Sequence, residues 1–172
     1  FGYGQPSDHK WIMVDIGVTF ADDTIPGVDL IYPDPGFIVE RRDNLLGIVL
    51  THAHEDHIGA VAHIWPSLKC KMFATPFTAT LLIEKFKEKK IDISSYLQVV
   101  PLNSKIKLGD FEIDFVTLTH SILEPNGLSI KTPLGTILHT GDWRIDPNPL
   151  IGNKIDEEKL KSNGESGASA MI

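Results

Sequence analysis

The sequence predicts an α/β fold that forms one domain or part of one. Short, nearly continuous apolar runs rich in β-branched residues alternate with stretches in which apolar residues recur at helical spacing. The chain has 172 residues, of which 42% are hydrophobic and 23% charged, as is typical of a protein with a packed core. Polar residues follow several of the apolar runs, and layered α/β proteins carry their chemistry at such strand ends.

The first half of the chain is predicted to contain two buried strands and two helices. Apolar runs indicate strands at residues 11–17 and 47–52. A helical pattern begins at Ile58, and we expect Pro66 to end it because proline lacks the amide hydrogen that continues a helix. A second helix should begin at Pro76, directly after an N-cap threonine, and end in a run of lysines.

The second half is predicted to be rich in strands. Apolar residues alternate over residues 106–115 on either side of a two-residue turn that opens with Gly109, which is typical of a β-hairpin. A second hairpin is expected over residues 127–140, with proline and glycine in the turn at 132–135. Residues 156–162 have a weak helical pattern.

Charge and cysteine content limit the classes of function. Sixteen basic and 23 acidic side chains give a net charge of 16 − 23 = −7, which argues against a generally basic surface that coats nucleic acid but says little about one cleft. The single cysteine, Cys70, excludes an intrachain disulfide and fits a reducing compartment, so we expect a cytoplasmic protein. We expect no membrane span and no secretory signal. Because the chain starts at Phe1 and ends in an apolar run, we expect both ends to be cut from something longer.

One segment concentrates metal-binding residue types. Residues 51–57, Thr-His-Ala-His-Glu-Asp-His, contain three histidines and two carboxylates between a predicted strand and a predicted helix. In an extended turn His52 and His54 point the same way, while Asp56 and His57 project from the start of the next helix. Two adjacent ligand sets indicate two metal ions. The alternative is a solvated polar loop that happens to hold histidines.

This pattern resembles the His-x-His-x-Asp-His signature of the metallo-β-lactamase superfamily. Asp15, His120 and Asp142 follow apolar runs in the order that this superfamily has. The longer stretches THAHEDHIGA, THSILEPNGLSIKTP and HTGDWRIDPNP resemble the RNase J group of the β-CASP ribonucleases, and the resemblance covers essentially the whole chain.

The resemblance implies a fold and a set of metal ligands. The fold would be the αββα sandwich, with residues 1–172 forming a partial metallo-β-lactamase domain from which the C-terminal part and the β-CASP domain are absent. Two zinc ions are implied, with manganese or magnesium as alternatives. Three histidines would hold the first ion, an aspartate and a histidine the second, and one aspartate would bridge the two: His52, His54 and His120; Asp56 and His57; Asp142.

The resemblance also implies a reaction. A hydroxide between the metals would attack a phosphodiester of RNA, with Asp56, His57 and Asp142 as the catalytic set. In the family a further histidine completes the second site, and no histidine follows Asp142 in this chain. We therefore expect weak binding of the second metal, little or no activity of this chain alone, and exposed apolar surface that favours a homo-oligomer or association with the missing C-terminal portion.

Several alternatives remain open at this point. The chain could be another hydrolase of the same fold, such as a glyoxalase II-like thioesterase, a lactamase or a tRNA-processing phosphodiesterase, or a non-catalytic remnant that acts as a binding module. Asp15 is expected to brace the histidine segment rather than bind metal. His139 could equally be a structural histidine or a hydrogen-bond partner of a metal ligand. For Trp143, a packing role is favoured over stacking on a nucleic-acid base. The sequence leaves open which metal is bound. It also leaves open whether the enzyme would act as an exonuclease or as an endonuclease.

Overall fold

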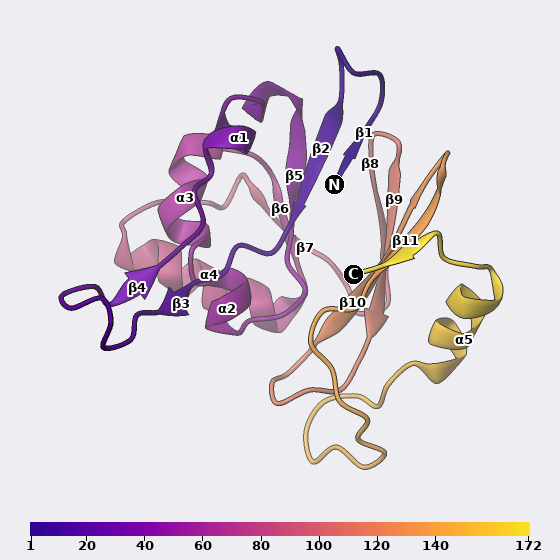
Figure 1. Ribbon diagram of the computed structural model, residues 1–172. Coiled ribbons are helices and arrows are strands. Elements are labelled where there is room, and N and C mark those ends of the chain that lie inside the picture. Colours follow the sequence, from indigo (N-terminus) through magenta and orange to yellow (C-terminus); the bar gives the residue numbers. More distant parts are fainter.

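The computed structural model describes all residues, 1–172, and consists of two five-stranded sheets packed face to face with helices outside them (Figure 1). The first sheet has the order β1-β2-β5-β6-β7, and only the β1–β2 pair is antiparallel. Its strands are β1 (Gly2–Tyr3), β2 (Lys10–Val14), β5 (Leu45–Val49), β6 (Met72–Ala74) and β7 (Leu97–Val99).

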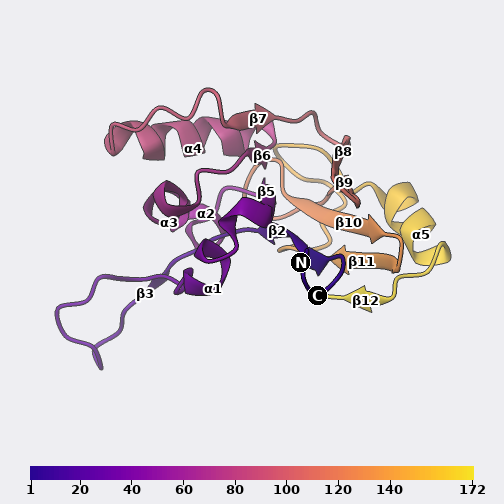
Figure 2. The ribbon, with the colours of Figure 1, turned by 90° about the horizontal axis from the view of Figure 1, so that it is seen from above.

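The second sheet is built by the C-terminal half and has the order β12-β11-β10-β9-β8. All its neighbouring strands are antiparallel except β11 and β12. They are β8 (Lys105–Leu108), β9 (Phe111–Thr117), β10 (Asn126–Thr132), β11 (Gly135–His139) and β12 (Ala170–Met171). A separate arm formed by β3 (Thr19–Phe20) and β4 (Leu30–Ile31) projects from the body of the molecule (Figures 1 and 2).

The helices are distributed unequally between the two outer faces. On the first sheet lie α1 (Gly36–Val39), α3 (Val61–Leu68) and α4 (Pro76–Glu88), with the 3-10 turn η1 (Arg42–Asn44) and the short α2 (Glu55–Ile58) in the connections. Only α5 (Glu157–Glu165) lies beside the second sheet, and it has no buried residue. The prediction of a partial αββα sandwich is confirmed, because three layers are packed and the fourth consists of this single helix.

Alternation along the strands divides the core into two clusters. Ile48 and Met72 face the helices, whereas their neighbours Val49 and Phe73 face the second sheet, because successive side chains of a strand point to opposite faces. The helix-side cluster contains 21 buried residues, and the cluster between the sheets contains nine, including Phe115. The near-continuous apolar runs predicted as strands are therefore buried on both faces.

The predicted hairpins and the helix that begins at Pro76 are confirmed, but the helix predicted from Ile58 to Trp65 is wrong in two respects. It is divided into α2 and α3, because the amide of Ala60 donates to Ile16 O instead of continuing the helix. It also passes Pro66 and ends at Leu68. A proline in the last turn removes only its own donor, and Lys69 N still donates to Trp65 O before the chain turns out in a left-handed conformation at φ 49°.

None of the helices combines the length and the apolar character that a membrane crossing would require.

Candidate metal centre

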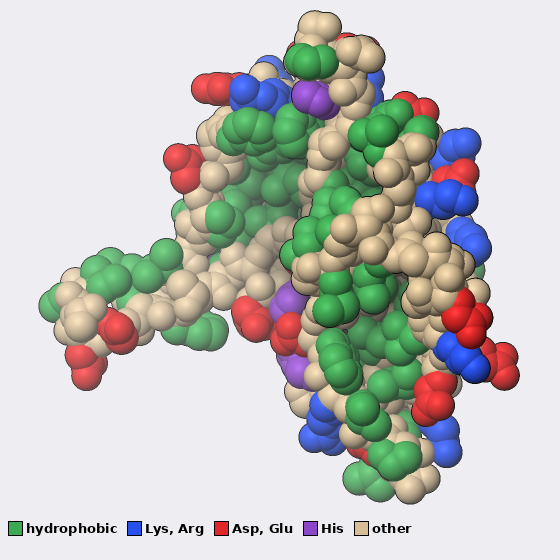
Figure 3. Space-filling model, turned by 45° about the vertical axis from the view of Figure 1, so that its right-hand side comes forward, with side chains coloured by type: hydrophobic (Ala, Val, Ile, Leu, Met, Phe, Trp, Pro, Cys, Tyr) green, Lys and Arg blue, Asp and Glu red, His purple; other side chains and the backbone are tan.

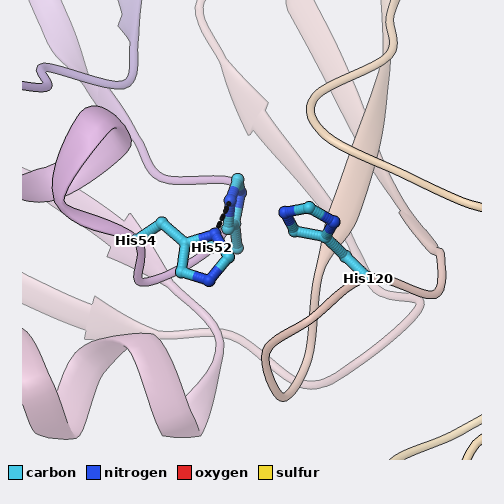
Figure 4. Close-up of side chains that lie close together, drawn as sticks. All are labelled: His52, His54 and His120. Atoms are coloured by element: carbon cyan, nitrogen blue, oxygen red, sulfur yellow. Dashed lines mark hydrogen bonds between the residues drawn. The ribbon is translucent and has the colours of Figure 1, made fainter.

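The predicted ligands come together at one edge of the sandwich, from three segments that follow strands. His52 and His54 follow β5 of the first sheet, whereas His120 follows β9 and Asp142 follows β11 of the second. Figure 4 shows the ring of His120 facing His52 and His54 across the space between the sheets. The site therefore exists only because the two sheets pack together.

The structure brings together the three histidines that the sequence predicts as the first ligand group, and their role as ligands stays a prediction. Nitrogen atoms of His52, His54 and His120 all lie within 4.8 Å of one another. His52 Nε2 is 3.2 Å from His54 Nδ1, and the ring centroids of His54 and His120 are 4.9 Å apart. Three imidazoles that converge in this way can hold one divalent cation.

The second group agrees with the prediction in part. It consists of His52, His57 and Asp142, so that His52 belongs to both groups. Asp142 lies between them, with Oδ1 3.4 Å from His57 Nε2 and Oδ2 3.5 Å from His120 Nε2, as a bridging ligand would. Asp56 is outside the group: its Oδ2 is 3.9 Å from His57 Nε2 and its side chain is 66% exposed. Its role as a ligand stays a prediction.

Asp15 braces the histidine segment in the way the sequence predicts. Its Oδ1 accepts a hydrogen bond from Thr51 N (2.8 Å), and its Oδ2 accepts one from Thr51 Oγ1 (2.6 Å). Oδ2 also lies 2.7 Å from His57 Nδ1. The left-handed conformation of Asp15, at φ 56°, turns the chain out of β2 toward these partners. This contact directs Nε2 of His57 toward Asp142, which is how an outer carboxylate orients a metal-binding histidine.

The electrostatics of the cluster favour neutral imidazoles at His52 and His120. Burial, followed by the neighbouring His57 and His54, lowers the pKa of His52 to about 3. Burial likewise lowers the pKa of His120. Burial opposes the charge of His57 as well, but Asp15, Asp142 and Asp56 together raise its pKa. Neutral nitrogens and adjacent carboxylates are the donors that zinc and related divalent ions prefer, so the side chains fit such a cation.

Close backbone packing holds α2 in place. Ile16 N donates to His57 O (2.7 Å) and Val18 N donates to Glu55 O (3.0 Å). Between them, a Cβ on Gly17 would lie 1.6 Å from Asp56 O, so only glycine fits. In the sequence Gly17 ends the apolar run at 11–17 and carries no signal of its own, so its packing against α2 is visible only in the structure. Glu55, which belongs to the same helix, forms an ion pair with Lys85 of α4 at 2.5 Å.

Two residues of open role lie outside the ligand groups. The rings of His139 and Phe1 pack edge-on, with their centroids 6.2 Å apart. Neither ring nitrogen of His139 has a hydrogen-bond partner. Trp143 is half-exposed and lines an apolar groove rather than the ligand cluster. Neither residue belongs to either of the two ligand groups.

Comparisons with known proteins identify the family of the chain. The pattern of the β-lactamase superfamily domain matches residues 10–160. The chain is 44% identical to a ribonuclease J of Sinorhizobium meliloti over its whole length and 31% identical to ribonuclease J 1 of Streptococcus pyogenes over 99% of it. It is 36% identical over 94% of its length to a ribonuclease J of Helicobacter pylori. The chain spans only 30%, 30% and 24% of these three relatives.

Solved structures show the same fold at low sequence identity. Zn(2+)-bound PqqB from Methylobacterium extorquens is similar with a TM-score of 0.54 and 10% identity, over 81% of this chain and 47% of that one. The metallo-β-lactamase fold protein YhfI from Bacillus subtilis is similar with a TM-score of 0.51 and 16% identity, over 80% and 52% of the two chains. The chain therefore belongs to the β-lactamase superfamily, with the metallo-β-lactamase fold and a sequence of the ribonuclease J type.

Proposed function

We propose that this chain carries the metal centre of an RNA phosphodiester hydrolase that depends on divalent metal ions, zinc in the first instance. The observation that carries the proposal is the pair of ligand groups joined by Asp142, in a chain that resembles ribonuclease J over its whole length. Bound cations would neutralise charge on a phosphodiester and lower the pKa of water, which is the chemistry that this reaction needs.

The chain's own residues have distinct roles in the proposal. His52, His54 and His120 each turn a ring nitrogen toward one shared position and would present it to one cation. Asp15 keeps the proton of His57 on Nδ1, so that Nε2 is free toward the second position. Asp142 offers one oxygen to each side and thereby fixes the distance between the two positions.

The second position is expected to bind its cation more weakly than the first. His52 cannot serve both groups at once, which leaves His57 and the partly exposed Asp142, with Asp56 only after a side-chain rotation. Fewer ligands and more solvent lower affinity. We therefore propose little or no RNA cleavage by residues 1–172 alone, and full activity only within a longer protein that supplies further ligands and RNA contacts. Such a protein is proposed to act in the cytoplasm.

A chimera tests the proposal directly. Residues 1–172 would replace the aligned segment of the Sinorhizobium meliloti ribonuclease J, and the product would be incubated with 5′-monophosphorylated RNA and zinc or manganese. The chimera should degrade the RNA, the same chimera with His54→Ala should not, and the isolated chain should be far slower than the chimera. His63→Ala, an exposed histidine outside the cluster, is the matched control and should remain active.

Two outcomes would contradict the proposal. One is a folded, metal-loaded chimera that leaves RNA intact. The other is hydrolysis of a thioester or a β-lactam by the chimera without hydrolysis of RNA, which would instead place the chain among the other hydrolases of this fold.

A further inference from the structure

The two halves of the sandwich are held together chiefly by apolar packing. Residues 1–100 form the first sheet with its helices, and residues 101–172 form the second sheet with α5. Nine buried apolar residues fill the space between the sheets. Such packing is strong but non-directional, so by itself it fixes the position of one sheet against the other only loosely.

Directional contacts between the halves are few and lie in one place. Three hydrogen bonds cross from residues 1–100 to residues 101–172: Asn126 N to Thr51 O at 3.2 Å, Asn126 Nδ2 to Thr51 O at 3.0 Å, and Phe77 N to Glu124 Oε2 at 2.8 Å. All three end on residues 124–126, which follow His120. The only other polar contact that crosses is the pairing of His57 with Asp142 inside the ligand cluster.

Asn126 makes two of these bonds, and its chemistry is specific to an amide. The residue is completely buried at the start of β10. Its Nδ2 donates to Thr51 O and also to Glu124 O, at 2.7 Å, whereas its Oδ1 has no partner. Both partners are carbonyl oxygens, so a donor must occupy this place, and a carboxylate of the same shape would face two acceptors.

Asn126 also contacts the third ligand segment. A Cβ on Gly141 would lie 2.8 Å from Asn126 O, and Gly141, at φ 56°, directly precedes Asp142. One buried residue therefore contacts the backbone next to His52, the loop that carries His120 and the backbone next to Asp142.

We propose that Asn126 is a positioning residue that sets His120 and Asp142 against His52 and His54, and so determines how tightly the centre binds its first metal. The inference rests on the proposed metal centre. Metal–ligand distances tolerate only a few tenths of an ångström, which the apolar contact between the sheets does not enforce but a pair of hydrogen bonds to one carbonyl does.

The test uses one chemical change at two positions. Asn126→Asp replaces the donating Nδ2 by an oxygen, whereas Asn103→Asp keeps the oxygen that accepts from Thr117 N inside the second half. Each protein is stripped of metal and titrated with Zn²⁺ against a chromophoric chelator, and the visible absorption spectrum is recorded with Co²⁺. Thermal unfolding without metal is measured in parallel.

The expected result is a loss of first-site Zn²⁺ affinity of about tenfold or more in Asn126→Asp, with an altered Co²⁺ spectrum, and wild-type behaviour in Asn103→Asp. If Asn126→Asp does not fold, Glu124→Ala replaces it. That change removes the hydrogen bond to Phe77 N from a partly exposed side chain, and it should lower the affinity in the same direction by a smaller factor.

The proposal is overturned if the folded variant shows wild-type affinity and a wild-type Co²⁺ spectrum, even when its metal-free melting temperature falls. An unchanged affinity in Glu124→Ala overturns it where that variant is needed. A wild-type chain that binds no divalent cation is a different failure, because it removes the proposed function itself and the role of Asn126 with it.

Discussion

The first sheet lies between two packed layers, whereas the second sheet has a packed layer on one side only. A cluster of 21 buried residues fills the layer between the helices and the outer face of the first sheet. The outer face of the second sheet instead borders an apolar groove of about 280 Å³ between β11, β12 and α5, here called the outer groove, which Leu138, Trp143, Ile145, Leu160 and Met171 help to line. Figure 3, in which the side that carries α5 comes forward, shows hydrophobic side chains exposed along this face.

The ligands follow the same division. The first sheet supplies His52, completely buried, and His57, whose side chain is 15% exposed. The second sheet supplies His120, 19% exposed, and Asp142, 42% exposed. The well-packed half thus holds the fixed part of the centre, and the incompletely covered half holds the part that depends on contacts between the sheets.

The largest expected effect comes from the second-sheet side of the centre. Asp142→Ala should abolish tight binding at both metal positions, because its two oxygens face one group each. His57→Ala should mainly empty the second position. Elemental analysis after equilibration with zinc measures the stoichiometry, with the fully exposed Asp43→Ala as a control. Unchanged metal content in Asp142→Ala would contradict the bridging assignment.

The next largest effect is expected on the free energy of unfolding, from variants that compare the packing of the two outer faces. Phe86→Ala on α4 removes a completely buried ring from the helix-side core and should lower the free energy of unfolding by about 3–5 kcal/mol. Trp143→Ala at the outer groove, which is 52% exposed, should cost less than about 1 kcal/mol. Urea unfolding of both variants measures the two values, and similar costs would mean that the outer faces are equally well packed.

A smaller, pH-dependent effect on stability is expected at the contact of Asp15 with His57. The pKa of His57 is raised above its ordinary value of 6.5 by Asp15, Asp142 and Asp56, despite burial. This pairing therefore contributes stability below about pH 6.5 that is lost as the pH rises through the folded pKa. In metal-free protein, Asp15→Asn should cost about 1–3 kcal/mol of unfolding free energy, and the cost should be larger at pH 6 than at pH 9.

Unfolding with urea at the two pH values provides the measurement. Asp15 also accepts hydrogen bonds from Thr51 N and Thr51 Oγ1, which do not involve His57, so part of the cost should persist at the higher pH. A cost that grows with pH would show that His57 is not the group involved.

The smallest effect on stability is expected at the outer groove. Ile145→Thr combined with Met171→Thr should change the free energy of unfolding by no more than about 0.5 kcal/mol, because both side chains are exposed. If the groove mediates self-association, the double variant should be more monomeric in sedimentation experiments. Phe20→Ser on the arm formed by β3 and β4 is the matched control. Self-association lost only in Phe20→Ser would assign the contact to the arm.

Much of the fold could be predicted because its signals are local. Strand alternation, the glycine that opens the turn at 109–110 and the threonine–proline start of α4 each depend on a few adjacent residues. The division into α2 and α3 could not be predicted, because the hydrogen bond that divides them, from Ala60 N to Ile16 O, joins residues 44 positions apart. The short strands β6 and β7 lack enough residues to display a period.

The sequence by itself determined the ligand types. Four histidines and two aspartates placed after strands predict the donor types of a divalent metal centre, since spacing and residue type are local properties of the chain. The tertiary structure decided what depends on distance: His52 belongs to both groups, Asp56 lies outside them, and Asp142 faces both His57 and His120. Asn126 lies in the stretch THSILEPNGLSIKTP, but nothing in the sequence marks it as a contact between the ligand segments. That position follows only from the contact of the two sheets.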